Sequence, residues 1–295
     1  YIRRMERYAA ERALAEKLVL DAGVIALKHR QSGMAFEEKP NDLGPVTAAD
    51  KEADTMIRAG IQAAFPQDAL LTEETPDDGA WRHSRRVWMV DPIDGTKEFI
   101  RGHADFACMI GLCVDGVPVV GAVFKPVDGV LYAATEGSGA WKTEGGVRTR
   151  MQVAETVTEP VVVAVSKSHR SNRLETLLAR LGPIRELPSG SVGLKVGLIC
   201  RGDAAVYLNP TSHTSLWDTA GPMAILREAG GTATDLFGNL LTWQGSVHHG
   251  QGLFFGTVAA HAHLLSRVVE TAGDVAKMLE AMPQYPGGAF RRVAG

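Results

Sequence analysis

The segment Val87–Phe99, VWMVDPIDGTKEF, joins an apolar run to side chains that carry oxygen ligands. Asp91 and Asp94 follow the apolar residues, and Gly95 and Thr96 come directly after them. Hard divalent cations such as magnesium bind oxygen ligands, and phosphate binds the free N–H groups of a tight turn. A strand that ends in such a turn indicates metal-assisted chemistry on a phosphorylated small molecule.

Three further segments place an acidic residue at the end of an apolar strand or at the start of a helix. They are Thr72-Glu73-Glu74, Thr47-Ala48-Ala49-Asp50 and Trp217-Asp218. A single acid at a helix start is typical of a helix cap and does not by itself indicate a metal site. Their combination with the Asp91–Thr96 segment favours one shared acidic site.

The bulk composition is that of an ordinary globular protein. The 295 residues suit one large or two ordinary domains, with 45% hydrophobic and 22% charged residues. A net charge of -3 and a pI near 6.3 give no sign of a surface for a nucleic-acid polymer. No apolar run reaches the length of a membrane span, and the charged first residues do not resemble a signal peptide. We therefore expect a cytoplasmic protein with no membrane partner.

The cysteine content agrees with a reduced compartment. Cys108, Cys113 and Cys200 are an odd number of cysteines, and all three lie in apolar segments. They are expected to be buried free thiols and not a disulfide or zinc framework.

Periodicity predicts an α/β chain in two parts. Amphipathic helices are expected over 5–30 and 48–65, followed by an antiparallel meander over 106–134 with turns at Asp115-Gly116 and Asp128-Gly129. After Pro160 strands and helices alternate. We place a boundary near residue 155, between an N-terminal α+β domain (1–155) with most of the candidate metal ligands and a C-terminal α/β domain (156–295) that contributes Asp218 and specificity residues.

Four segments together resemble a known family. They are Val46–Asp50, Glu73-Glu74, Trp88–Thr96 and Leu216–Ala220. In this order they resemble the lithium-sensitive, magnesium-dependent sugar phosphatases, which include inositol monophosphatases and 3'(2'),5'-bisphosphate nucleotidases. The resemblance implies alternating helix and sheet layers and a magnesium-dependent phosphoric monoester hydrolase with two to three Mg²⁺ ions.

The resemblance also implies a set of metal ligands. Glu73, Asp91 and the Ile93 carbonyl would hold the first magnesium, and Asp91, Asp94 and Asp218 the second. A third, weaker ion would lie beside Glu73. Such a pair of ions generates hydroxide at neutral pH and stabilises the leaving oxygen.

The catalytic residues implied by the resemblance are Glu73, Thr96, Asp50 and Thr47. Thr96 and Asp50, with Thr47 nearby, would form the hydrogen-bonded pair that helps to activate the attacking water. The backbone N–H groups of Gly95 and Thr96 would bind the phosphate oxygens.

The substrate is expected to be a small phosphate ester, most closely a bisphosphate nucleotide. Lys97-Glu98-Phe99 resembles the nucleotidase branch, and Thr211 stands where inositol enzymes carry a sugar-binding glutamate. The turn Ser166–His169, with Ser191 and Lys195, would bind the second phosphate of adenosine 3',5'-bisphosphate. A monomer or homodimer is expected.

Three alternatives are weighed against this interpretation. Haloacid-dehalogenase-like phosphatases carry Asp-x-Asp-Gly-Thr, whereas Asp91 and Asp94 are separated by two residues, and Glu73 and Asp218 would have no role. A non-enzymatic sensor could keep the fold and bind metal or nucleotide. An inositol monophosphatase or other sugar phosphatase of the same family is the nearest alternative.

Overall fold

The computed structural model describes residues 7–32, 36–38, 45–168, 170–212 and 214–280. The helices are α1 (Ala9–Ser32), α2 (Ala48–Ala64), α3 (Thr96–Ile100), α4 (Asn172–Arg180), α5 (Val192–Cys200), α6 (Leu216–Glu228) and α7 (Val258–Glu280). The strands of the first half are β1 (Phe36–Glu38), β2 (Pro45–Thr47), β3 (Ala69–Thr72), β4 (Arg86–Asp94), β5 (Ala107–Val114), β6 (Val117–Lys125), β7 (Val130–Thr135), β8 (Gly139–Glu144) and β9 (Val147–Met151). Those of the second half are β10 (Val161–Ser166), β11 (Ile184–Ser189), β12 (Val206–Asn209), β13 (Gly231–Thr234) and β14 (Leu253–Thr257).

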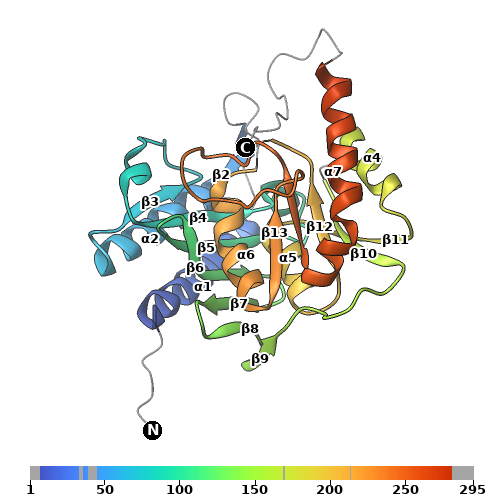
Figure 1. The fold of residues 1–295 in the computed structure, drawn as a ribbon. Coiled ribbons are helices and arrows are strands. Elements are labelled where there is room, and N and C mark those ends of the chain that lie inside the picture. The colour runs from blue at the N-terminus through green and yellow to red at the C-terminus, as the bar shows by residue number, and fades with distance from the viewer. Residues whose placement is uncertain (1–6, 33–35, 39–44, 169, 213, 281–295) are drawn as a thin grey trace.

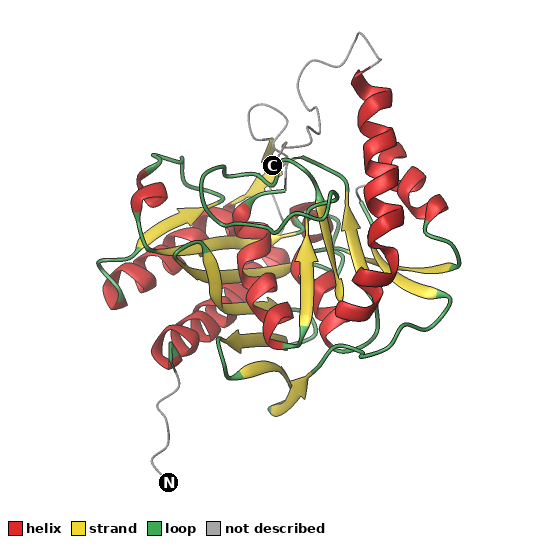
Figure 2. Cartoon of the chain, in the orientation of Figure 1, coloured by secondary structure: helices red, strands yellow, loops and turns green. Residues whose placement is uncertain are grey.

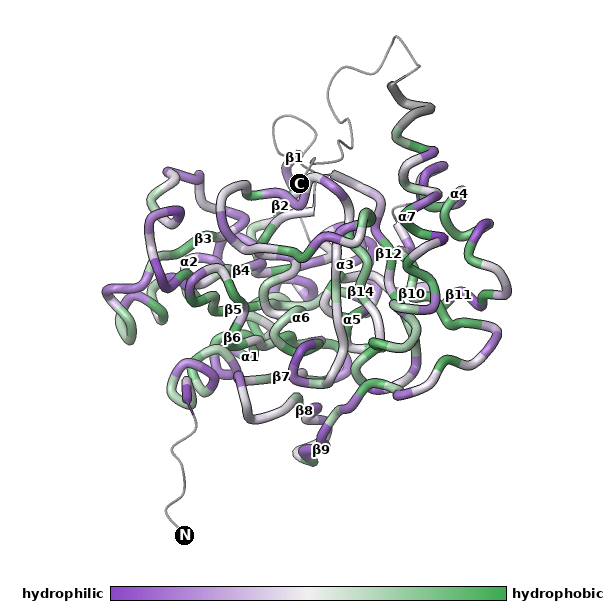
Figure 3. The backbone as a smooth tube through the Cα atoms, in the orientation of Figure 1, coloured by the Kyte–Doolittle hydropathy of each residue, from purple (hydrophilic) through white to green (hydrophobic). Residues whose placement is uncertain are grey.

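The larger sheet has seven strands in the order β3-β4-β5-β6-β7-β8-β9. All neighbours are antiparallel except β3 and β4, which are parallel. Strands β5 to β7 form the predicted meander, and Asp115-Gly116 and Asp128-Gly129 lie in its two turns. The edge strand β9 is mainly hydrophilic (Figure 3) and exposed, as befits the border of a sheet.

The smaller sheet has five strands in the order β11-β10-β12-β14-β13. Strands β11, β10 and β12 are parallel, whereas β14 is antiparallel to both β12 and β13. The sheet is therefore mixed, because β14 alone runs against the direction that β10, β11, β12 and β13 share.

Helices and sheets alternate in layers, as predicted (Figures 1 and 2). Helices α1 and α2 pack on one face of the seven-stranded sheet. Helices α5 and α6 lie between the two sheets, and their apolar residues join both sheets in one hydrophobic cluster. Helices α4 and α7 cover the outer face of the five-stranded sheet. The predicted division at residue 155 stays a prediction, since this cluster contains residues from both halves.

Helix α6 approaches the large sheet unusually closely. A Cβ added to Gly121 of β6 would lie 2.1 Å from the carbonyl oxygen of Gly221, and one added to Gly111 of β5 would lie 2.5 Å from the Gly221 nitrogen. Backbone therefore meets backbone at this crossing, which only glycine permits. The crossing brings the first turn of α6 close to the end of β4.

The structure confirms most of the predicted elements. Helix α2 begins after Thr47 as expected, and α5 begins after Ser191. The three cysteines are buried and free. Four strands had not been predicted: β1 and β2, of three residues each, β11, which is mostly polar, and β13, a short strand of small residues. A final helix is expected from the sequence over 261–282, of which residues 281 and 282 lie outside the described residues.

Candidate active site

A bulge at the end of β4 brings two acidic side chains to one face. Asp91 pairs with Met109 and Asp94 pairs with Ala107, so β4 contains one more residue than β5 across this interval. In a regular strand, residues three apart point to opposite faces. The extra residue restores a common direction, and Pro92, which has no N–H to donate, is well tolerated at a bulge.

Glu73 lies beside this bulge because β3 runs parallel to β4. Thr72, the last residue of β3, pairs with Val90, and the Glu73 N–H donates to the Val90 carbonyl at 3.1 Å. Glu73 is therefore the direct neighbour of Asp91 across the sheet. The shared carboxyl ends of the two parallel strands explain why the predicted acids meet.

Asp218 enters the same region from the second half of the chain. It lies in the first turn of α6, where its Oδ2 accepts from the backbone N–H of Ser215 at 2.8 Å. Its side chain is also in hydrogen-bonding contact with Asp91. The close crossing of α6 over β5 and β6 thus joins acids that are far apart in the sequence.

The acids act on one another electrostatically because they lie close together. Burial raises the pKa of Asp91 well above its usual range, and the negative charges of its neighbours raise this pKa further. The neighbours are Glu73, Asp94, Asp218 and Asp50. The pKa of Asp218 is raised by burial and then by the charges of Asp94 and Glu73. Such a set of carboxylates favours a cation, which offsets both burial and repulsion.

Asp94 is held by the start of α5. Its Oδ2 accepts from the Ser191 hydroxyl and the Val192 N–H, both at 2.5 Å, and from the Gly193 N–H at 3.3 Å. Burial raises the pKa of Asp94, while Lys195 and these donors lower it in part. The bond from Ser191 to Asp94 was not anticipated from the sequence, where Ser191 was assigned to substrate. In the sequence, Gly190-Ser191 before the apolar residues of α5 indicates a helix cap and gives no sign of a bond to Asp94.

Thr47 and Asp50 form a buried capping box at the start of α2. The Thr47 hydroxyl donates to Asp50 Oδ2 at 2.5 Å, and the Thr47 N–H donates to the same oxygen at 2.8 Å. The Thr96 hydroxyl donates to the Ile93 carbonyl at 3.0 Å. Gly95 adopts a left-handed φ of 93°, which allows the chain to turn from β4 into α3. The predicted pairing of Thr96 with Asp50 stays a prediction.

Lys195 is a buried cation close to the acids. It is 2% exposed, its Nζ donates to the carbonyl of Gly190, and it lies 5.0 Å from the ring centre of Tyr207. Burial lowers its pKa to about 8, although the charge of Asp94 among others opposes the shift. Its predicted contact with a substrate phosphate stays a prediction.

The turn after β10 is bonded to α3 and to the segment that follows it. Lys167 pairs with Asp105, and the Ser168 hydroxyl donates to Glu98 and accepts from Arg101. Ser166 ends β10 and is half-buried, whereas His169 lies outside the described residues. The turn is therefore attached to the residues that follow the predicted phosphate-binding pair, Gly95 and Thr96.

The oxygen atoms of the predicted metal ligands are of the kind that magnesium binds. Buried carboxylates and a carbonyl are the oxygen ligands that magnesium prefers, and no nitrogen or sulfur ligand stands in the set. Among the described residues, no three histidine, cysteine, aspartate or glutamate side chains are already gathered as one set of metal ligands. Several of the oxygens accept protein hydrogen bonds instead, so the assignment of each ligand stays a prediction.

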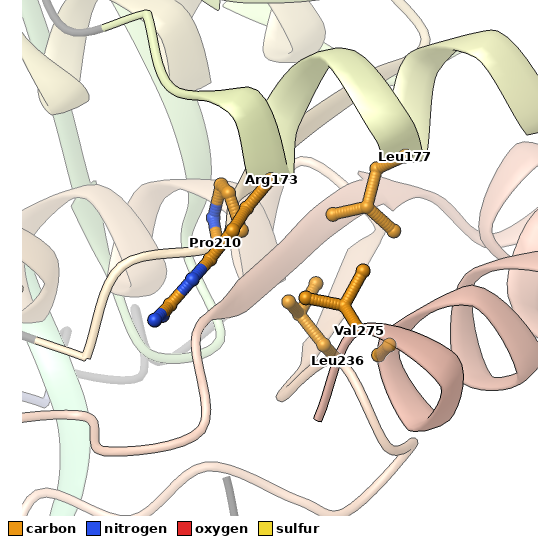
Figure 4. A pocket seen from close by; sticks show the side chains of 6 residues that line it. Arg173, Leu177, Pro210, Leu236 and Val275 are labelled. Atoms are coloured by element: carbon orange, nitrogen blue, oxygen red, sulfur yellow. The ribbon is translucent and has the colours of Figure 1, made fainter. Parts of the chain in front are cut away.

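The cavity in Figure 4 is unrelated to this acidic site. It lies against α4 and α7, and its lining consists of Arg173, Leu177, Pro210, Leu236, Ala272 and Val275. Its volume of about 10 Å³ holds roughly one water molecule.

None of the described helices is long and apolar enough to cross a membrane.

Comparison with known proteins shows the family to which the chain belongs. Residues 8–272 match the model of the inositol monophosphatase family. The chain is 41% identical to the 3'(2'),5'-bisphosphate nucleotidase CysQ of Salmonella typhimurium over 217 residues, which cover 72% of this chain and 82% of that protein. It is 31% identical to the inositol-1-monophosphatase of Bacillus subtilis, with 78% of this chain and 87% of that protein covered.

A solved structure gives the same result. The CysQ structure from Bacteroides thetaiotaomicron, described as a bacterial member of the inositol monophosphatase family, superposes with a TM-score of 0.72. The two chains are 29% identical, and the match covers 85% of this chain and 98% of the other. The resemblance drawn from the sequence is thus confirmed: this chain belongs to the inositol monophosphatase family.

Proposed function

We propose that the protein is a magnesium-dependent phosphomonoesterase that removes the 3'-phosphate from adenosine 3',5'-bisphosphate and leaves AMP. The observation that carries the proposal is the convergence of Glu73, Asp91, Asp94 and Asp218 at the end of β4. The identity of 41% to a 3'(2'),5'-bisphosphate nucleotidase supports the choice of substrate.

Glu73, Asp91 and the Ile93 carbonyl would hold one ion, and Asp91, Asp94 and Asp218 a second; a third would lie beside Glu73. When bound, magnesium lowers the pKa of a coordinated water and neutralises charge on the phosphate. The Ile93 carbonyl accepts a hydrogen bond from the Thr96 hydroxyl at 3.0 Å, and its second lone pair would serve this role.

The remaining roles belong to side chains and backbone of this chain. Asp50, fixed by Thr47, would orient the attacking water together with Thr96 and accept its proton. The N–H groups of Gly95 and Thr96 would bind the phosphate oxygens, since the turn at Gly95 leaves the start of α3 without a side-chain cap.

The second phosphate requires a positive charge that the metal ions at the scissile phosphate do not supply. Lys195 and the turn Ser166–His169 are proposed for this role, and Ser191 would join them through its position at the start of α5. Since the Ser191 hydroxyl already donates to Asp94, its substitution would disturb both the metal site and the substrate site. The cytoplasmic location and the monomeric or homodimeric state stay predictions.

The test is a comparison of kcat/KM for adenosine 3',5'-bisphosphate, inositol 1-phosphate and fructose 1,6-bisphosphate with magnesium present. We expect the nucleotide to be preferred, and turnover to vanish in Asp91→Asn while the fold persists. A preference for inositol 1-phosphate would replace the proposed substrate and leave the metal mechanism intact. Folded wild-type protein without any phosphatase activity would refute the enzyme and favour a sensor.

A further inference from the structure

A segment late in the chain is paired with the residues that precede Asp218. The Leu216 N–H donates to the Val247 carbonyl and the His249 N–H to the Thr214 carbonyl, each at 2.9 Å. Between them, Ser215 and His248 form an antiparallel bridge. The first turn of α6 therefore starts from a short two-stranded contact with residues 247–249.

Side chains from the same segment meet beside Asp218. Thr219, the next residue, has its hydroxyl 2.9 Å from Nε2 of His249 and accepts from Nε1 of Trp243 at 3.0 Å. Thr219, His249 and Trp243 are 0%, 7% and 3% exposed. The rings of Trp243 and His249 meet edge to face, with their centroids 5.5 Å apart. A buried, hydrogen-bonded group of this kind has little freedom to move.

We infer that His249 is a positioning residue for Asp218, which it holds through the Thr219 hydroxyl with the support of Trp243. The inference rests on the proposed function, in which Asp218 is a magnesium ligand. A ligand that is already oriented binds the ion more tightly, because no ordering of the helix turn is needed on binding. Loss of the imidazole would loosen this turn and weaken magnesium binding.

The chain contains a matched control. Nε2 of His261 lies 2.9 Å from the hydroxyl of Thr234, and His261 is 6% exposed. Its ring stacks on Phe254 at 4.2 Å, in the hydrophobic cluster between the smaller sheet and α7. The two histidines thus make the same kind of buried bond, but only His249 is linked to the turn that carries Asp218.

The experiment compares His249→Leu, His249→Gln and His261→Leu with the wild type, all as full chains. Mg²⁺ binding to metal-stripped protein is measured by calorimetry, and amide hydrogen exchange is followed over residues 214–220. We expect His249→Leu to raise the Kd for Mg²⁺ about tenfold, the equivalent of one net hydrogen bond, and to accelerate exchange in this segment. The amide of His249→Gln restores a polar partner for Thr219, so its Kd should stay within about threefold of wild type.

His261→Leu should lower the urea midpoint about as much as His249→Leu does, because both remove one buried hydrogen bond. It should leave the Mg²⁺ Kd unchanged. Wild-type affinity and exchange in His249→Leu, or an equal loss of affinity in His261→Leu, would overturn the inference. If His249→Leu does not fold, Trp243→Phe removes the indole N–H and part of the ring while it keeps an aromatic side chain, and a smaller loss of affinity in the same direction is expected. Wild-type affinity in Trp243→Phe would overturn the inference. A wild type that binds no Mg²⁺ would instead overturn the proposed function itself.

Discussion

The crossing of α6 over the large sheet offers a sharp test of how Asp218 is positioned. In Gly121→Ala the new Cβ would lie 2.1 Å from the Gly221 carbonyl oxygen, whereas real Cβ contacts essentially never fall below 3.0 Å. The helix must therefore move away by the difference between these distances, about 0.9 Å. Asp218 precedes Gly221 by three residues on the same helix and would move with it.

A displacement of about 1 Å in an active site costs roughly 100-fold in rate. Overpacking of this kind also lowers the free energy of unfolding by about 1–3 kcal/mol. We expect both effects in Gly121→Ala, measured as kcat for adenosine 3',5'-bisphosphate at saturating magnesium and as urea unfolding. A higher magnesium requirement should accompany the loss of rate, because Asp218 moves away from Asp91.

The control is Gly273→Ala in α7, where an added Cβ meets nothing within 4 Å. Alanine is the better helix former by roughly 1 kcal/mol, so this variant should be as stable as the wild type or more stable, with unchanged kcat. Full activity and full stability in Gly121→Ala would show that the crossing is not a rigid contact. The account of how Asp218 is positioned would then be wrong.

Three further predictions concern the acids and His249. Asp218→Asn should lower magnesium-dependent turnover by about 100-fold or more without loss of thermal stability, since the acids repel one another; full activity would remove Asp218 from the metal site. Burial and the charge of His248 lower the pKa of His249 from 6.5 to about 4, so the unfolded chain takes up a proton between these pH values that the folded protein does not. The contribution of His249 to stability is therefore complete above pH 6.5 and should fall by about 3 kcal/mol as the pH decreases to 4. Stability from urea unfolding should decline less steeply with falling pH in His249→Gln than in the wild type, and equal slopes would contradict the shift. Lithium should inhibit at concentrations at which sodium and potassium do not, because it resembles magnesium in size with half the charge; equal effects of the three cations at limiting magnesium would count against its binding at Asp91, Asp94 and Asp218.

The elements that carry local signals could be predicted from the sequence. Asp115-Gly116 and Asp128-Gly129 mark hairpin turns wherever they join apolar strands, and the meander follows from them. Thr47 followed by Asp50 marks the start of α2, which the capping box confirms. These features depend on neighbours a few residues apart.

The features that were not predicted from the sequence depend on residues far apart in the chain or have no recognisable sequence pattern. The bulge between Asp91 and Asp94 exists only in the register with β5, which the sequence of β4 alone does not contain. Strand β11 has no alternation of buried and exposed residues and includes Pro188, so nothing distinguishes it from a loop. The bond from Ser191 to Asp94 joins residues 97 positions apart, and no local rule links them.

This last separation bears on how the protein is made. The amino-terminal half leaves the ribosome first, so Glu73, Asp91 and Asp94 emerge before the residues that complete their surroundings. The three donors to Asp94 follow 97 to 99 positions later, and Asp218 later still. A nascent chain that ends before residue 191 therefore contains Glu73, Asp91 and Asp94. It lacks both the hydrogen-bond donors to Asp94 and the fourth acid, Asp218. Binding of the second magnesium, which requires Asp218, would mark the moment at which the second half of the chain has docked.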